Sequence, residues 1–211
     1  PFSVFENCGQ DCCARSRLLV EESAKEELLE RYVAATRAIV VGDPESPETQ
    51  VGPMVSGAQR ETVEGYIAKG VEEGAIVAEG GARPDDPALA SGYYLRPTVL
   101  DGCTNEMTVS REEIFGPVVS VITFRDEAEA IRLANDTPYG LSGSLWTRDG
   151  ARQLRVARAL RTGGIGVNSN SSVFPQAPFG GYKQSGSGKE LGMEGLLHNT
   201  ELKSVFISTE A

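Results

Sequence analysis

The stretch PVVSVITF, residues 117–124, is apolar at nearly every position. A strand with one face in water alternates apolar and polar side chains, whereas a strand covered on both faces is apolar almost throughout. This stretch therefore predicts a buried strand in a sheet that has helices on both sides. The segments around it indicate the class of that sheet.

Segments with helical spacing of apolar residues alternate with short segments typical of strands. The predicted helices begin at Ser23, Ser56, Asp126, Asp149 and Lys189, and the predicted strands cover residues 16–20, 75–78, 93–100, 117–124, 141–147, 163–168 and 201–208. This alternation favours an α/β fold, here a three-layer Rossmann-like domain with a mostly parallel sheet flanked by helices. Active groups in such folds lie in loops at the carboxyl ends of strands.

Three local features carry predictions of their own. Ser23 stands three residues before Glu26, as in a capping box at a helix start. Trp146 falls in a predicted strand, so its large apolar ring is expected in the core. Lys189 and Glu201 are expected to form an ion pair near the last strand.

The net charge of the 211 residues is −10. An acidic chain repels phosphate backbones, so no nucleic-acid partner is expected. The apolar stretches are too short to span a bilayer and no secretory signal is present, so no membrane partner is expected. The expected location is cytoplasmic.

The chain has four cysteines: Cys8, Cys12, Cys13 and Cys103. Adjacent cysteines rarely form a disulfide, because the geometry is strained. The spacing matches no zinc pattern and the one histidine, His198, is far away in the sequence, so no metal site is expected. Cys8 and Cys103 are expected to be packing residues.

Three loops contain the residues from which a site can be built. They are NCGQDCC (residues 7–13), EEIFGP (residues 112–117) and the segment 168–188, which runs into PFGGYKQSGSGKE (residues 178–190). The last loop is not a phosphate-binding loop, which needs Lys-Ser/Thr after its final glycine, where this chain has Ser187 and Gly188. It does not fit the dinucleotide fingerprint either, because its glycine spacing is one residue too long.

Together, the three loops resemble the catalytic domain of the NAD(P)-dependent aldehyde dehydrogenase superfamily. NCGQDC (residues 7–12) is similar to that family's catalytic cysteine motif, EIFGP (residues 113–117) to its glutamate motif and PFGGYKQSG (residues 178–186) to its substrate-side loop. The motifs occur in the family's order, and the resemblance covers essentially the whole chain.

The resemblance implies a role for several residues. Cys12 would be the nucleophile, and Glu113 and Phe115 would hold the nicotinamide end of NAD or NADP. The residues implied to line the aldehyde tunnel are Asp11, Cys13, Val173 and Phe179. In this family the thiolate attacks the aldehyde carbonyl, the thiohemiacetal passes hydride to the nicotinamide, and water hydrolyses the resulting thioester to the acid. Covalent catalysis of this kind divides one hard oxidation into two easier steps.

Asp11 directly precedes the implied nucleophile. A neighbouring carboxylate favours the neutral thiol and raises its pKa, unless a positive charge arrives with the cofactor or the substrate. Glu6 is a second acid nearby. The two acids suggest an amino- or betaine-type aldehyde as the substrate, whereas the alternative is that both face solvent or pair with Arg15 or Arg17.

The resemblance also implies a domain organisation. Residues 1–200 would form the catalytic domain and residues 201–211 a C-terminal oligomerisation strand. The family's cofactor-binding domain, oxyanion asparagine and general-base glutamate lie upstream of the cysteine and are absent from this chain. We therefore expect this chain alone to be inactive, and the intact protein to act on a small-molecule aldehyde as a homodimer or homotetramer.

Two other functions stay open at this point. One is a non-enzymatic assembly or scaffold domain on the same fold, which selective reaction of Cys12 with an electrophile would distinguish from an enzyme. The other is a cofactor-independent cysteine esterase, against which the lack of a histidine partner in the cysteine motif argues.

Overall fold

Strand β4 (Val118–Phe124) lies inside a four-stranded sheet in the computed structural model, which describes residues 1–171 and 173–210. It pairs in parallel with β1 (Arg17–Glu21) and β3 (Thr98–Cys103), and β2 (Ile76–Glu79) pairs antiparallel with β3 at one edge. The first five residues of β4 are buried. This confirms the predicted strand that is covered on both faces.

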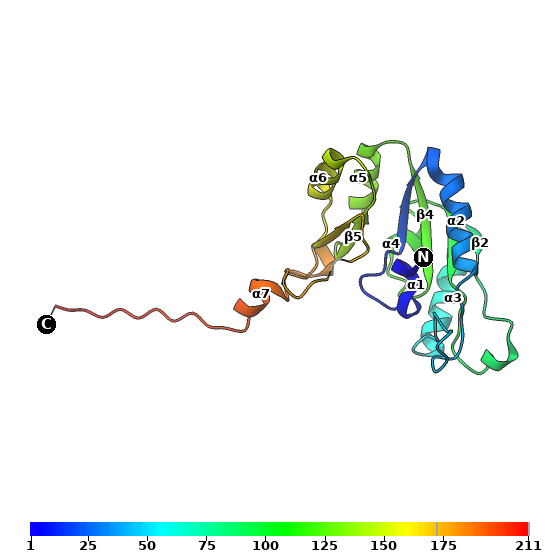
Figure 1. The fold of residues 1–211 in the computed structure, drawn as a ribbon, viewed down its shortest axis with the longest axis horizontal. Coiled ribbons are helices and arrows are strands. Elements are labelled where there is room, and N and C mark those ends of the chain that lie inside the picture. The colour runs from blue at the N-terminus through cyan, green and yellow to red at the C-terminus, as the bar shows by residue number, and fades with distance from the viewer. Residues whose placement is uncertain (172, 211) are drawn as a thin grey trace.

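Helices flank this sheet, as Figure 1 shows. They are α1 (Phe2–Phe5), α2 (Lys25–Arg37), α3 (Gly57–Glu72) and α4 (Thr108–Arg111). Helices α1 and α2 meet through Phe5 and Tyr32, whose ring centroids are 6.2 Å apart. Helix α3 packs beside α4, and the Ser120 hydroxyl of β4 donates to the Val109 carbonyl of α4 at 3.1 Å. The arrangement is the α/β fold predicted from the sequence, with a mostly parallel sheet between helices.

The second half of the chain adds a separate two-stranded parallel sheet. The sheet consists of β5 (Ser142–Leu145) and β6 (Gly164–Val167), and the helices of this half are α5 (Glu127–Asn135) and α6 (Gly150–Ala159). Arg17 of β1 donates to the carbonyls of Leu133 and Ala134 at 3.1 and 3.0 Å, and the Asn105 amide donates to the Leu133 carbonyl at 2.9 Å. These bonds tie the end of α5 to the main sheet.

Three of the five predicted helix starts are side-chain caps in the structure, and the helix predicted from Lys189 begins later, at Gly192. Ser56, Asp126 and Asp149 each accept a backbone N–H in the first turn of α3, α5 and α6. The capping box at Ser23 is wrong, because a short 3₁₀ turn precedes α2 and moves its start to Lys25. The Ser23 hydroxyl donates instead to the Glu21 carboxylate at 3.2 Å.

Two side-chain predictions are also wrong. Trp146 follows β5 and is 63% exposed, because the strand ends at Leu145 before the ring can be covered. Lys189 does not pair with Glu201. Its ammonium group donates to the carbonyls of Gly180 and Gly181 at 3.0 and 2.7 Å, which holds it inside the substrate-side loop.

The C-terminal segment follows α7 (Gly192–Leu197) and extends away from the body (Figure 1). The strand predicted over residues 201–208 is not formed in this single chain, since residues 201–210 join no sheet and are exposed. A strand needs a neighbouring strand for its backbone hydrogen bonds, and none is available here. Residue 211 lies outside the described residues.

None of the helices among residues 1–171 and 173–210 has the length and apolar character needed to cross a bilayer.

Candidate active site

The cysteine loop lies between α1 and β1, and left-handed backbone shapes it. Asn7, Cys8 and Gly9 have φ angles of 51°, 57° and 67°. The Asn7 amide donates to the Gln10 carbonyl at 2.8 Å, which closes the turn. The Cys8 side chain is buried beneath this turn, as predicted for a packing cysteine.

Asp11 and Cys12 lie at the tip of this loop, where both side chains are exposed. The Asp11 carboxylate accepts the Cys13 N–H at 2.8 Å, and the Asp11 carbonyl accepts the Ala14 N–H at 3.0 Å. The Cys12 N–H donates to no acceptor among the described residues. Both the thiol and the adjacent backbone donor of Cys12 are therefore accessible to a ligand.

The surroundings of Cys12 favour its neutral thiol. Partial burial, the Cys13 thiol and the Asp11 carboxylate together raise the pKa of Cys12 to about 11, and partial burial is the largest of these causes. The direction predicted for Asp11 is confirmed, although partial burial is the larger cause. Burial likewise raises the pKa of Cys8 to about 12 and that of Cys103 to about 11, and both of these thiols are inside the protein.

This raised pKa predicts how the thiol reacts in the absence of cofactor. Alkylation of Cys12 by iodoacetamide is expected to accelerate with rising pH up to about 11, because only the thiolate reacts. Asp11→Asn removes one cause of the shift, so its rate profile is expected to move to lower pH. Peptide mass spectrometry across a pH series measures both profiles. A profile that stays the same in Asp11→Asn would contradict the role given to this carboxylate.

The glutamate loop touches the cysteine loop through backbone atoms. A Cβ atom on Gly9 would lie 2.1 Å from the Gly116 carbonyl oxygen, so only glycine allows this approach. The side chain of Gln59 in α3 donates to the carbonyls of Ile114 and Phe115, each at 3.1 Å. This clamp holds Phe115 at a φ of 53° with its ring 40% exposed.

Glu113 lies on the same loop with its side chain exposed. Its neighbour Glu112 accepts a hydrogen bond from the Tyr66 hydroxyl at 2.8 Å, whereas the Glu113 carboxylate has no hydrogen-bond or ion-pair partner among the described residues. Glu113 and Phe115 are thus both exposed on one loop. Their contact with a nicotinamide nucleotide stays a prediction.

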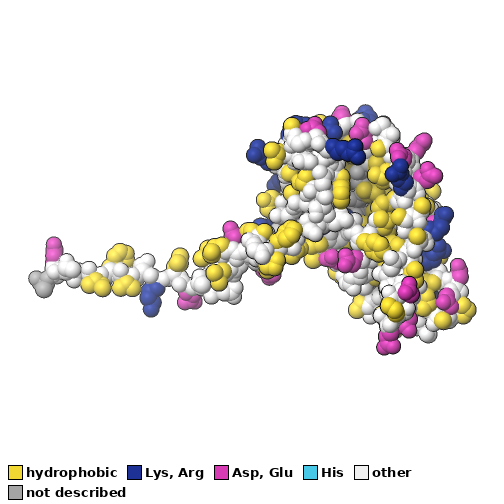
Figure 2. Space-filling view, viewed as in Figure 1, with side chains coloured by type: hydrophobic (Ala, Val, Ile, Leu, Met, Phe, Trp, Pro, Cys, Tyr) yellow, Lys and Arg dark blue, Asp and Glu magenta, His cyan; other side chains and the backbone are white. Residues whose placement is uncertain are grey.

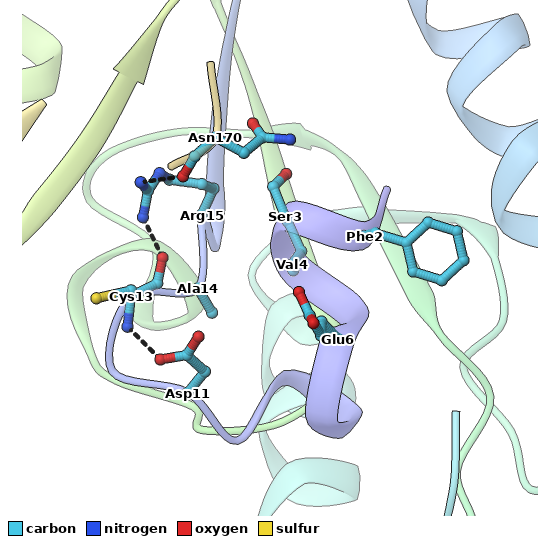
Figure 3. Close-up of a pocket in the computed structure, with 9 residues that line it drawn as sticks. All are labelled: Phe2, Ser3, Val4, Glu6, Asp11, Cys13, Ala14, Arg15 and Asn170. Carbon is cyan, nitrogen blue, oxygen red and sulfur yellow. Dashed lines mark hydrogen bonds between the residues drawn. The ribbon is translucent and has the colours of Figure 1, made fainter. Parts of the chain in front are cut away.

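A pocket of about 90 Å³ opens beside the cysteine loop. Figure 3 shows Glu6, Asp11, Cys13 and Arg15 around it, with Asn170 from the substrate-side loop closing one side. The pocket is smaller than the ~300–1,000 Å³ typical of ligand sites. Cys13 lines this pocket, whereas its neighbour Cys12 is not among the lining residues.

The other two predicted pocket residues do not line this cavity. Val173 is 47% exposed, and Phe179 pairs through its backbone with Glu190, with N–H to O distances of 2.7 Å in both directions. Their predicted contact with the substrate stays a prediction.

Two features of the site are missed by sequence reasoning. One is Arg15, which lines the pocket and bonds to residues from distant segments, and the other is the clamp formed by Gln59. Neither has a local sequence signal, because the partners are brought together only by the fold.

The donor atoms of Asp11, Cys12 and Cys13 lie within 4.8 Å of one another, which is close enough for all three to reach one metal ion. The spacing of zinc motifs has other residues between the ligands, so it does not include consecutive residues such as these. The absence of a metal site stays a prediction.

Comparison with known proteins identifies the chain's relatives. Residues 1–205 match the model of the aldehyde dehydrogenase family. The chain belongs to the aldehyde dehydrogenase family. Betaine aldehyde dehydrogenase from Bacillus subtilis (strain 168) is 45% identical over 208 residues, which cover 99% of this chain and 42% of that enzyme. Betaine aldehyde dehydrogenase from Rhizobium etli (strain CIAT 652) is 46% identical over 96% of this chain and 42% of its own length.

Solved aldehyde dehydrogenase structures share the fold. The Mycobacterium tuberculosis aldehyde dehydrogenase complexed with NAD+ superposes with a TM-score of 0.94 at 43% identity, covering 100% of this chain and 43% of that one. A betaine aldehyde dehydrogenase from Staphylococcus aureus, in complex with NAD+ and carrying a BME-modified cysteine, gives 0.91 at 41% identity over 93% of this chain and 40% of its own. The chain thus spans about 42% of the length of the curated relatives that it matches.

Proposed function

We propose that this chain is the catalytic part of a longer NAD(P)-dependent oxidoreductase that oxidises an aldehyde to a carboxylic acid through Cys12. One observation carries the proposal: an exposed thiol stands on a loop that is in backbone contact with the loop of Glu113 and Phe115. A nucleophile and a nucleotide-binding pair must lie this close if hydride is to leave the carbon attached to sulfur.

The residues of the chain supply a defined part of this chemistry. The Cys12 thiolate attacks the aldehyde carbon, and the new C–S bond turns the carbonyl into an oxyanion that the free Cys12 N–H can stabilise. A bound nicotinamide nucleotide, held by Glu113 and Phe115, would supply the hydride acceptor. Water then attacks the Cys12 thioester, which breaks the C–S bond, releases the acid and restores the thiol.

The charges around the pocket favour a cationic aldehyde. Glu6 and Asp11 both line it, and Arg15 is its one lining cation among the described residues, with hydrogen bonds to protein oxygens. Two relatives of this chain are betaine aldehyde dehydrogenases, named for a cationic aldehyde. We therefore propose an amino- or trimethylammonio-aldehyde as the substrate.

A pair of isosteric substrates tests the function and the charge preference together. The intact protein is expected to form NADH faster with betaine aldehyde than with neutral 3,3-dimethylbutanal, whereas the 211-residue chain alone is expected to form none. Asp11→Asn and Glu6→Gln should each lower the ratio of the two kcat/KM values about threefold, since each removes one exposed charge near the cation. Glu26→Gln makes the same change on the exposed surface of α2 and should leave the ratio unchanged. An intact protein that prefers the neutral aldehyde would refute the charge preference.

The two alternatives from the sequence predict other outcomes. A scaffold domain would form no NADH with any aldehyde, and a cofactor-independent esterase would hydrolyse a p-nitrophenyl ester with its full rate in the absence of NAD. Within the described residues, His198 is exposed at the end of α7, apart from the cysteine loop (Figure 1), so it offers no base to Cys12.

The C-terminal segment is proposed as an oligomerisation strand. Figure 2 shows apolar side chains along α7 and the extended segment. Within this segment Leu202, Phe206 and Ile207 are 101%, 94% and 83% exposed. Such a row of unpaired backbone and apolar side chains needs a partner strand.

Light scattering should show a homodimer or homotetramer for the intact protein and a smaller species after deletion of residues 201–211. A monomer in both samples would contradict this.

A further inference from the structure

Arg15 forms hydrogen bonds with three segments that meet at the pocket. Its Nε donates to the Ser144 hydroxyl at 3.0 Å, and its Nη1 donates to the Ser142 hydroxyl at 2.7 Å and also to the Cys13 carbonyl. Its Nη2 donates to the Asn170 carbonyl at 3.0 Å. One side chain thus joins Cys13, strand β5 and the substrate-side loop. Figure 3 shows the bonds of Arg15 to Cys13 and Asn170.

The chemistry of arginine suits this junction. Ser142 and Ser144 lie two residues apart on β5, so their hydroxyls point to the same side of the strand. The planar guanidinium presents its N–H groups in fixed directions, and no other side chain could donate to four acceptors of this arrangement. Burial of the guanidinium lowers its pKa, but an arginine remains protonated.

These bonds also argue against a direct role of Arg15 in binding the substrate. Its N–H groups point at protein oxygens from three segments, so the side chain is committed to the pocket wall. It is therefore a weak candidate for binding an anionic group of a substrate.

We propose that Arg15 is a positioning residue that fixes the distance between Cys13 and the substrate-side loop at Asn170, and thereby sets the width of the aldehyde pocket. The consequence for aldehyde binding rests on the proposed function, whereas the link between the loops does not. Arg15 acts through its neighbours and takes no part in the reaction of the thiol.

Steady-state kinetics of the intact protein test the consequence. Arg15→Gln is expected to raise the KM for betaine aldehyde about tenfold, because the loop loses its charged tether. The KM for NAD should not change, and kcat should change by less than about threefold. Arg15→Lys keeps the charge but lacks the planar guanidinium, so its KM for betaine aldehyde should lie between those of the wild type and Arg15→Gln. Arg125→Gln removes an arginine whose side chain bonds to Glu129 on the surface of α5, and it should match the wild type.

Hydrogen exchange of the same variants tests the link without reference to activity. Amides of residues 168–171 are expected to exchange faster in Arg15→Gln than in the wild type or in Arg125→Gln. Unchanged exchange there, or a lower Tm with the KM for aldehyde unchanged, would overturn the proposal. If the wild-type protein oxidises no aldehyde, the proposed function fails, and the exchange data still decide whether Arg15 holds the loop.

Discussion

Replacing Cys12 by alanine in the intact protein is expected to lower kcat/KM for its aldehyde by at least about 10⁴-fold. The reason is that the thiol forms the covalent bond on which both half-reactions depend. Cys8 and Cys103 are buried, and the partly exposed Cys13 is not the residue that the family motif assigns as the nucleophile. Progress curves of NADH formation at saturating NAD provide the measurement.

A matched control is available in the same chain. Cys103→Ser changes one atom at a buried site in β3, where a hydroxyl can still donate to the Leu100 carbonyl as the thiol does at 3.5 Å. This variant should keep the wild-type kcat/KM. A Cys12→Ala variant that retained more than about a hundredth of the activity would rule out Cys12 as the nucleophile.

Gly9→Ala is expected to destabilise the protein by about 3 kcal/mol or more. A non-glycine residue at a φ of 67° costs about 1–2 kcal/mol, and forcing extra atoms into a packed site costs a further 1–3 kcal/mol. The new methyl group would meet the Gly116 carbonyl at 2.1 Å, and backbone atoms cannot rotate away as a flexible side chain can. The two loops must therefore separate, and activity should fall with stability.

Urea denaturation of the intact protein, followed by circular dichroism, measures this effect. Gly65→Ala is the control, because Gly65 lies in α3 with nothing within 4 Å of its added Cβ. Alanine is the better helix former, so this control should be more stable by up to about 1 kcal/mol. Equal midpoints for Gly9→Ala and the wild type would show that the two loops are not in the contact described.

The local parts of the fold are predictable from the sequence. Strand β4 is apolar along its length, and Asp126 and Asp149 cap their helices through bonds to residues two or three positions away. The start of α2 is not predictable in this way, because the 3₁₀ turn at Glu22–Ala24 competes with the capping box. The exposure of Trp146 is not predictable either, because the sequence pattern indicates a strand but not that it ends at Leu145.

The candidate site also has parts that the sequence predicts and parts that it does not. Its motifs predict Cys12, Glu113 and Phe115 as site residues, and the direction of the Asp11 effect follows from charge alone. The contacts between distant segments do not follow from any local pattern. The contact of Gly9 with Gly116 and the hydrogen bond of Arg15 to Asn170 both depend on how the sheet brings the loops together. The strand predicted over residues 201–208 is not formed in the single chain, where it has no neighbouring strand to pair with.

Trapping the covalent intermediate tests the role of Cys12 most directly. The intact protein is mixed with aldehyde and NAD, quenched in acid during turnover, and digested for peptide mass spectrometry. The proposed chemistry predicts the mass of the acyl group on the peptide that contains Cys12, located on that sulfur, and no label in the Cys12→Ala variant. Acid product formed at the full rate with the acyl group on another residue, or on none, would contradict it.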